Sequence, residues 1–254
     1  MRQHIANFVT LSNLFFGCCA VLYLLNGQPH TAAWCILGAF LCDYADGMIA
    51  RALGVASPLG RELDSLADAV SFGVAPGAML YSLLAQVYCS GRAATPLFEA
   101  PLFQGIPLPV CTAALPAFIL SMFSALRLAK FNLDTRQKNY FIGLSTPGCT
   151  LFVLGLTLAA ADNQFGIGAL LWEQPWIIYG LVVLLSFLLV SEIPMYGLKI
   201  RSMRWKGNEM PFFFIFLSAS ALYFLRGAGL SSLIIFYVLL SIVSRQKIQA
   251  VDTQ

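Results

Sequence analysis

Four aspartates at regular spacing are the residues of this chain best suited to chemistry. A carboxylate next to hydrocarbon is costly, so it needs a partner or a function. Several carboxylates that meet at one point repel one another unless cations lie between them, and hard oxygen ligands favour Mg²⁺ or Mn²⁺. Two such ions can clamp a phosphate group during its transfer. The aspartates, which lie in otherwise mostly apolar segments, are Asp43, Asp46, Asp64 and Asp68.

The placement of these aspartates on helices decides whether they can converge. Asp43 and Asp46 lie about one turn apart on one helix face, and Asp64 and Asp68 do so on the next helix. The connection over residues 52–60 is short, so the two helices must run antiparallel. The sequence therefore predicts that both pairs of carboxylates face one space between the helices.

Small and basic residues accompany the aspartates. Gly47 and Ala50 lie one turn apart, and Gly60 lies about one turn before the second pair of aspartates, which leaves room for a bulky ligand. Arg51 can bind a phosphate group at the membrane surface. Glycines of this kind taken alone more often serve helix packing. A structural cluster of salt bridges between the aspartates, Arg51 and Arg61 is another explanation of the pattern.

The composition indicates that membrane helices position these residues. Of 254 residues, 59% are apolar and 11% are charged, whereas a soluble domain has roughly 25% charged residues. A membrane-spanning helix needs about 20 mostly apolar residues, and eight such runs are visible. The predicted fold is therefore an all-α polytopic membrane helix bundle. The runs cover residues 8–25, 31–51, 61–84, 109–130, 146–161, 174–192, 210–225 and 229–244.

The placement of basic residues supports this count. With a cytoplasmic N-terminus, all but two of the 15 Lys and Arg residues fall on the inner side, the exceptions being Arg92 and Arg226. Such a bias is typical of cytoplasmic loops and predicts that both termini lie in the cytoplasm. We therefore expect a multi-pass protein of the inner (cytoplasmic) cell membrane. The aspartates then lie at the cytoplasmic ends of the second and third spans, so the site should face the cytoplasm.

Two other kinds of site are not expected. No basic stripe with interleaved aromatic residues is visible, so nucleic acid is not an expected partner. The seven cysteines form no Cys-x-x-Cys pair and there are only two histidines, which argues against a zinc site. Cys89 and Cys111 bracket a connection expected outside the cytoplasm, and the sequence leaves open whether they form a disulfide.

The aspartate segment resembles the signature of the CDP-alcohol phosphotransferases, Asp-x₂-Asp-Gly-x₂-Ala-Arg-x₈-Gly-x₃-Asp-x₃-Asp. The resemblance implies an integral membrane enzyme with a six-helix core that uses divalent metal. Such an enzyme moves a phosphoalcohol group from a CDP-linked donor to an acceptor hydroxyl and releases CMP. We expect this core in residues 1–192, two additional spans in 193–254, and a homodimer. The fixed positions are filled by Asp43, Asp46, Gly47, Ala50, Arg51, Gly60, Asp64 and Asp68.

Further stretches are similar to the integral-membrane phosphatidylserine synthases of bacteria. They are residues 7–13, 71–76, 127–132 and 141–147, with Lys130 at a position where Arg is usual. The resemblance implies CDP-diacylglycerol and L-serine as substrates, met among membrane lipids. Phosphatidylserine and CMP would be the products.

The resemblance also implies roles for the residues of the signature. Asp43, Asp46 and Asp64 would hold metal, and Asp68 would take the proton from the serine hydroxyl and could also touch a metal. A carboxylate crowded by like charges binds a proton more tightly, which suits a general base. We expect two ions, with the choice between Mg²⁺ and Mn²⁺ open. The donor nucleotide would lie against Gly47, Ala50, Arg51 and Gly60.

The serine carboxylate needs a cationic partner. Arg127, Lys130 and Arg136 are the candidates, with Asn132 beside them. Arg127 ranks first because it lies within an apolar run rather than in a loop. All three cations can also be explained as ordinary basic residues at the cytoplasmic end of a span.

Two alternatives remain. A sister enzyme would use glycerol phosphate, inositol phosphate or choline as acceptor, and the two phosphorylated acceptors would need more cationic side chains near the site. A cation-coupled transporter would show inverted repeats and broken helices in both halves. The acidic residues here gather in one pair of helices, which favours the enzyme.

Overall fold

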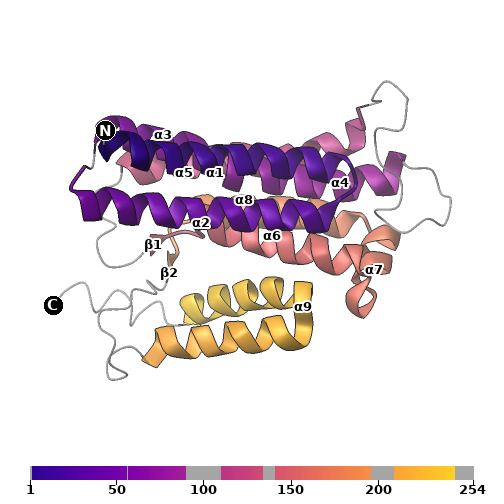
Figure 1. Cartoon of the computed structure of the whole chain (residues 1–254). Coiled ribbons are helices and arrows are strands. Elements are labelled where there is room, and N and C mark those ends of the chain that lie inside the picture. Colours follow the sequence, from indigo (N-terminus) through magenta and orange to yellow (C-terminus); the bar gives the residue numbers. More distant parts are fainter. Residues whose placement is uncertain (1, 56, 90–109, 134–140, 196–208, 244–254) are drawn as a thin grey trace.

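Helices make up almost all of the described chain. The computed structural model describes residues 2–55, 57–89, 110–133, 141–195 and 209–243. Figure 1 shows long helices aligned along a common direction, with the N-terminal helix and the last helix on opposite sides. The strands in these parts are β1 (Phe141–Ile142) and β2 (Pro194–Met195), which pair antiparallel.

A helix lies over each of the eight segments expected from hydropathy. The last of these helices is broken at Arg226, where the backbone leaves helical geometry. The helices are α1 (Arg2–Leu25), α2 (Pro29–Leu53), α3 (Pro58–Asp68), the π-helix η1 (Ala69–Val74), α4 (Ala75–Cys89), the 3₁₀-helix η2 (Thr112–Phe118), α5 (Ile119–Leu133), α6 (Thr146–Ala161), the 3₁₀-helix η3 (Gln164–Gly166), α7 (Ile167–Glu173), α8 (Trp176–Val190) and α9 (Glu209–Val243).

Five of these stretches are long and apolar enough to cross a membrane. The pair formed by α6 and η3–α7, bent by 107°, makes a sixth if it is one span, and α8 is apolar but has only 15 residues. The all-α polytopic membrane fold is therefore confirmed, whereas the count of eight spans stays a prediction. The five stretches are His4–Leu25, Pro29–Leu53, Pro58–Cys89, Thr112–Leu133 and Leu225–Val243.

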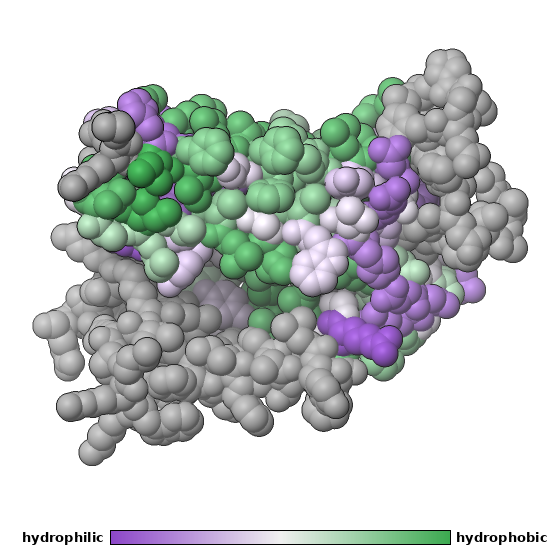
Figure 2. All heavy atoms as spheres, viewed as in Figure 1, coloured by the Kyte–Doolittle hydropathy of each residue, from purple (hydrophilic) through white to green (hydrophobic). Residues whose placement is uncertain are grey.

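The third span is the centre of the bundle, and large apolar side chains on other helices face outward. Most of its apolar window is buried, with Met79 and Leu83 fully enclosed. Phe8, Trp34 and Trp176 are each at least 70% exposed. Figure 2 shows apolar residues covering much of one face of the helices. An apolar outer surface of this kind is what contact with lipid requires.

One face of α1 packs into the bundle with a mixed character. Its buried residues recur at intervals of three and four, which places them on a single helix face. The first half of this face is partly polar and the second half is apolar. It comprises Ala6, Thr10, Asn13, Gly17, Ala20 and Leu24.

A tight turn makes α2 and α3 run antiparallel, and both helices pack against α1. α2 ends at Gly54, whose positive φ of 62° is a conformation that glycine adopts without steric cost. The Val55 N–H then donates to the Ala50 carbonyl oxygen at 3.0 Å, which completes the helix end. Ser57 caps α3 by accepting the Gly60 N–H at 3.0 Å. These local interactions bring the two pairs of aspartates to the same end of the bundle.

The π-helix η1 follows Asp68 directly and is anchored by hydroxyl groups of neighbouring helices. Pro76 has no N–H to donate to the Phe72 carbonyl oxygen, and the Thr150 hydroxyl of α6 donates to it instead, at 3.1 Å. The Ser121 hydroxyl of α5 donates to the Gly73 carbonyl oxygen at 2.8 Å. Single π-turns often occur at functional sites, and this one fixes the direction in which α3 enters the bundle.

Cys89 and Cys111 form a disulfide, which settles the question that the sequence left open. It joins the end of α4 to the start of η2. The Cys111 N–H also donates to the Tyr81 hydroxyl at 3.2 Å. The bond therefore ties the third and fourth spans together at the end of the bundle remote from the aspartates.

Candidate metal and nucleotide site

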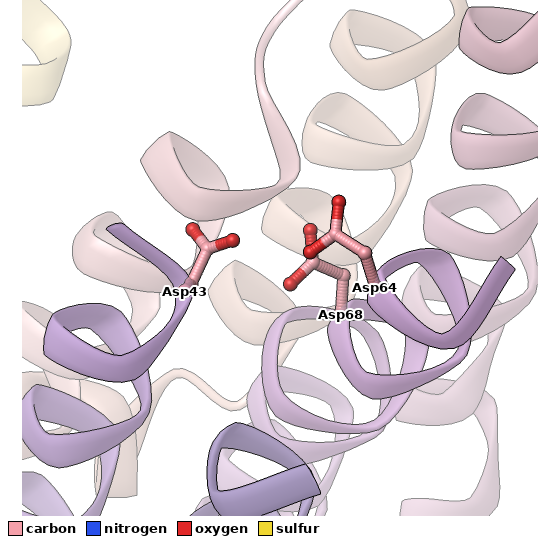
Figure 3. Close-up of side chains that lie close together, drawn as sticks. All are labelled: Asp43, Asp64 and Asp68. Atoms are coloured by element: carbon pink, nitrogen blue, oxygen red, sulfur yellow. The ribbon is translucent and has the colours of Figure 1, made fainter. Parts of the chain in front are cut away.

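Three of the four aspartates converge on one point. Carboxylate oxygens of Asp43, Asp64 and Asp68 all lie within 4.8 Å of one another. Figure 3 shows the three side chains directed into a common space, Asp43 from α2 and the other two from α3. This spacing suits a shared divalent cation bound through oxygen.

The partners of these carboxylates strengthen that interpretation. Among the described residues, no Lys or Arg forms an ion pair with the three aspartates. The ion pair found in the described parts of the chain joins His30 and Asp162, away from the cluster, at 3.0 Å. The Asp64 Oδ1 atom is buried without a hydrogen-bond partner in the described parts of the chain. A buried carboxylate oxygen without a donor is costly, and a metal ion would satisfy it.

Asp46 lies beside this cluster rather than in it. Its side chain is buried, and its Oδ2 atom accepts a hydrogen bond from the Thr10 hydroxyl at 2.6 Å. The structure thus brings together three of the four expected metal ligands. The fourth lies in the wall of an adjacent cavity, held there by α1.

That cavity joins the small residues of the signature. It has a volume of about 240 Å³ and reaches Asp46 and Asp64. The Arg51 guanidinium lies over Gly47, with its Nη1 atom 3.7 Å from where a Cβ would stand. A Cβ at Gly60 would lie 3.2 Å from the Ser57 hydroxyl oxygen. All four expected donor-binding residues line the cavity, together with α1 residues: Ala6, Asn7, Thr10, Gly47, Ala50, Arg51 and Gly60.

Two polar residues of α1 contact the site although the sequence did not identify them as site residues. Thr10 binds Asp46, and the fully buried Asn13 donates from Nδ2 to the Asp68 Oδ1 atom at 3.1 Å. The Ser71 hydroxyl donates to the Asn13 carbonyl oxygen at 3.0 Å. The available signal was polar side chains on one face of an apolar span, which need partners inside the bundle.

Of the acceptor candidates that the structure describes, Arg127 is the buried one. It is 7% exposed, its Nη1 atom lies 3.5 Å from the Thr146 hydroxyl oxygen, and its guanidinium lies 5.6 Å from the centre of the Phe131 ring. Its Nε atom has no hydrogen-bond partner among the described residues. The guanidinium is also close enough to Asp68 for electrostatic interaction.

The other candidates lie in different environments. Asn132 is exposed and donates from Nδ2 to the Ser65 hydroxyl at 2.8 Å, next in the chain to Asp64. Lys130 is exposed on the surface of α5. Arg136 lies outside the described residues. The structure therefore brings Arg127 into the bundle next to the aspartates and leaves Lys130 on its surface.

Comparison with known proteins agrees with this geometry. The family model described as CDP-alcohol phosphatidyltransferase matches residues 3–188. The chain is similar to proteins named CDP-diacylglycerol–serine O-phosphatidyltransferase from three bacteria. The match to that of Mycobacterium leprae is 34% identical over 200 residues, or 76% of this chain and 58% of the relative.

The other two matches cover more of the relative. The Helicobacter pylori (strain J99) protein is 31% identical over 214 residues, or 84% of this chain and 79% of the relative. The Bacillus subtilis protein is 36% identical over 157 residues, or 61% of this chain and 77% of the relative. Because the family model covers most of the chain, including all eight signature residues and the α1 residues that contact them, the chain belongs to the CDP-alcohol phosphatidyltransferase family.

Proposed function

We propose that this protein transfers the phosphatidyl group from CDP-diacylglycerol to the hydroxyl of L-serine, giving phosphatidylserine and CMP. The observation that carries the proposal is the convergence of Asp43, Asp64 and Asp68 beside the cavity lined by the signature's small residues. Relatives from bacteria and yeast bear the name of this activity. The substrates would reach the site among membrane lipids.

The metal would be Mg²⁺ or Mn²⁺, in two ions. Asp43 and Asp64 supply oxygen ligands of one site, which Asp68 can also touch, and Asp46 lies next to them for the second. When bound, the metal supplies positive charge that binds the donor pyrophosphate and neutralises the leaving CMP. Thr10 keeps the Asp46 carboxylate turned toward the cavity through its 2.6 Å hydrogen bond.

Asp68 is the proposed general base. It takes the proton of the serine hydroxyl as that oxygen forms a bond to the phosphorus on the lipid side of the pyrophosphate. The bond from this phosphorus to the bridging oxygen breaks, and CMP leaves with the electron pair. Asn13 orients the Asp68 carboxylate through the hydrogen bond between Nδ2 and Oδ1.

The donor nucleotide is assigned to the cavity between α1, α2 and α3. Gly47, Ala50 and Gly60 leave room for the cytidine, and Arg51 lies where it can bind a phosphate oxygen. Larger side chains at the glycine positions would occupy the space that the ligand needs. The cavity reaches Asp46 and Asp64, so its occupant would touch the metal-binding carboxylates.

The acceptor site is assigned to the opposite side of the aspartate cluster, at Arg127. A buried guanidinium without a carboxylate partner is costly, and the serine carboxylate would pair with it. Asn132 is a second candidate through its contact with Ser65. Lys130 and Arg136 are proposed only as supporting cations at the membrane surface.

We assign residues 1–192 to the catalytic core and 193–254 to two additional spans. The distribution of Lys and Arg supports an inner-membrane protein with both termini in the cytoplasm, and with the aspartates open to the cytoplasm. We also propose that the protein functions as a homodimer. The match of the family model to residues 3–188 is consistent with the extent of the core.

The direct test is release of CMP from CDP-diacylglycerol by the purified protein, with and without serine and EDTA. We expect serine-dependent release of CMP, formation of phosphatidylserine, and loss of both with EDTA. Release driven instead by glycerol phosphate, inositol phosphate or choline would make the protein a sister enzyme. No release with any acceptor, together with cation flux into vesicles, would favour a transporter.

A further inference from the structure

The last helix lies beyond the region matched by the family model, yet it packs closely against α6. The Ser231 hydroxyl donates to the Phe152 carbonyl oxygen at 2.8 Å. A Cβ at Gly155 would stand 2.7 Å from the Ser231 backbone nitrogen, and a Cβ at Gly227 would stand 2.8 Å from the Leu158 Cβ. Glycine on both helices thus allows the two backbones to approach closely. The position of this helix on α6 is therefore well defined.

The register of this contact carries Tyr237 toward the acceptor side of the site. The two helices run antiparallel, with Ser231 facing Gly155. Continuing the same register, Tyr237 lies opposite Cys149. Thr146 lies one turn before Cys149 on α6, and its hydroxyl accepts a hydrogen bond from the buried Arg127 guanidinium of α5.

The burial of α9 agrees with this register. Tyr237 is half-buried and packs against the apolar core, whereas Leu239 is 56% exposed and Ile235 49% exposed. The Tyr237 phenol also lies within electrostatic range of the Arg127 guanidinium. The last span therefore contributes a polar group to the surroundings of Arg127.

The described surroundings of Arg127 contain little negative charge. The described neighbours with which its guanidinium interacts include the Phe131 ring, the Thr146 hydroxyl, the Cys149 thiol, the Tyr237 phenol and the Asp68 carboxylate. Most of these groups are neutral, so the charge of the guanidinium is available to a ligand anion. A single cation with neutral polar neighbours suits a group with one negative charge, such as a carboxylate, better than a phosphate dianion.

We propose that Tyr237 is a specificity-determining residue, which forms with Arg127 the binding site for an acceptor that is a small amino acid. The inference rests on the proposed function and extends it to a span outside the family match. A phenol can both donate and accept a hydrogen bond. Its hydroxyl would bind the ammonium or carboxylate of the acceptor while Arg127 pairs with the carboxylate, so acceptors lacking either group would be discriminated against.

The test measures KM for serine and for CDP-diacylglycerol in purified Tyr237→Phe and Tyr237→Leu proteins. We expect the KM for serine to rise about tenfold or more, the range for loss of a hydrogen bond to a charged group. The KM for CDP-diacylglycerol should change less than about twofold. Tyr23→Phe is the matched control, since it removes a phenolic hydroxyl from the end of α1 remote from the aspartates, and it should leave both KM values unchanged.

The outcomes separate this inference from the proposed function. If the unmodified protein shows no serine-dependent CMP release, the proposed function fails, and this inference fails with it. If the unmodified protein uses serine while both Tyr237 variants keep its KM for serine, only the inference is wrong. A parallel change in both KM values with a lower midpoint of thermal unfolding would assign Tyr237 a structural role and also overturn it.

Discussion

The Asn13 side-chain amide donates a hydrogen bond to the Asp68 Oδ1 atom at 3.1 Å and so joins α1 to the aspartate cluster. Asn13 is fully buried, and its backbone carbonyl oxygen accepts a hydrogen bond from the Ser71 hydroxyl at 3.0 Å. A carboxylate that must hold metal or accept a proton has to keep one orientation. The first span therefore controls the geometry of a residue that lies far away in the sequence.

Replacing Asn13 with Ala should lower kcat without a comparable change in donor binding. The Asp68 carboxylate would lose its orienting donor, and we expect kcat to fall by about one to two orders of magnitude. Steady-state kinetics and equilibrium binding of CDP-diacylglycerol would measure the two effects. Ser12→Ala is the control, because this neighbouring hydroxyl donates to the Phe8 carbonyl oxygen of its own helix. Equal losses in both variants would contradict the orienting role.

Asp68→Asn should abolish turnover while metal-dependent binding of CDP-diacylglycerol is largely retained. The amide cannot accept the proton of the serine hydroxyl, and loss of a general base typically costs about 10²–10⁴-fold in rate. Single-turnover CMP release and donor binding in the presence of Mg²⁺ check the two parts. If binding is lost to the same extent as turnover, Asp68 acts first as a metal ligand.

Asp43→Asn and Asp64→Asn should weaken metal binding itself. Each change removes one negative oxygen ligand from the three that lie within 4.8 Å of one another. We expect the Mn²⁺ dissociation constant to rise by at least about tenfold, because hard cations prefer charged oxygen ligands. Electron paramagnetic resonance of added Mn²⁺ measures binding without any need for activity. Asp162→Asn, at the surface ion pair with His30, should bind Mn²⁺ normally.

Arg127→Ala should raise the KM for serine far more than the KM for CDP-diacylglycerol. Loss of a buried charged hydrogen bond to the serine carboxylate should cost roughly tenfold or more in serine binding. Arg127→Lys should keep more of the serine affinity than Arg127→Ala but less than the unmodified protein, because an ammonium lacks the two-pronged geometry of a guanidinium. An unchanged KM for serine in Arg127→Ala would remove this residue from the acceptor site.

Gly47→Leu should raise the KM for CDP-diacylglycerol more than the KM for serine, the reverse of the effect expected for Arg127→Ala. The larger side chain would enter the cavity beneath the Arg51 guanidinium and raise the KM for CDP-diacylglycerol, by roughly tenfold. The KM for serine should change little. Gly180→Leu is the control, since apart from its chain neighbours and the backbone of its own helix no described atom lies within 4 Å of the Cβ position at this glycine of α8. A larger effect on serine than on the lipid would contradict the assignment of the cavity to the donor.

The sequence alone determined the features that depend on local order along the chain. Hydropathy located the apolar helices apart from α7, and the turn residues between 52 and 60 implied the antiparallel directions of α2 and α3, which Gly54 and Ser57 produce. Helical spacing placed each pair of aspartates on one face. These conclusions were possible because helix periodicity and turn chemistry act over a few residues.

Tertiary packing decided the features that depend on how each helix is rotated about its own axis. It selected Asp43, Asp64 and Asp68 for the shared cluster and turned Asp46 toward Thr10. Packing also buried Arg127 while leaving Lys130, on the same helix, exposed.

The same packing joined Cys89 to Cys111, brought Asn13 to Asp68, and placed Ser231 of α9 against Phe152 of α6. Each of these relationships joins segments that lie far apart in the chain. Helical spacing defines the faces of each helix, but contacts between helices decide which face meets which neighbour.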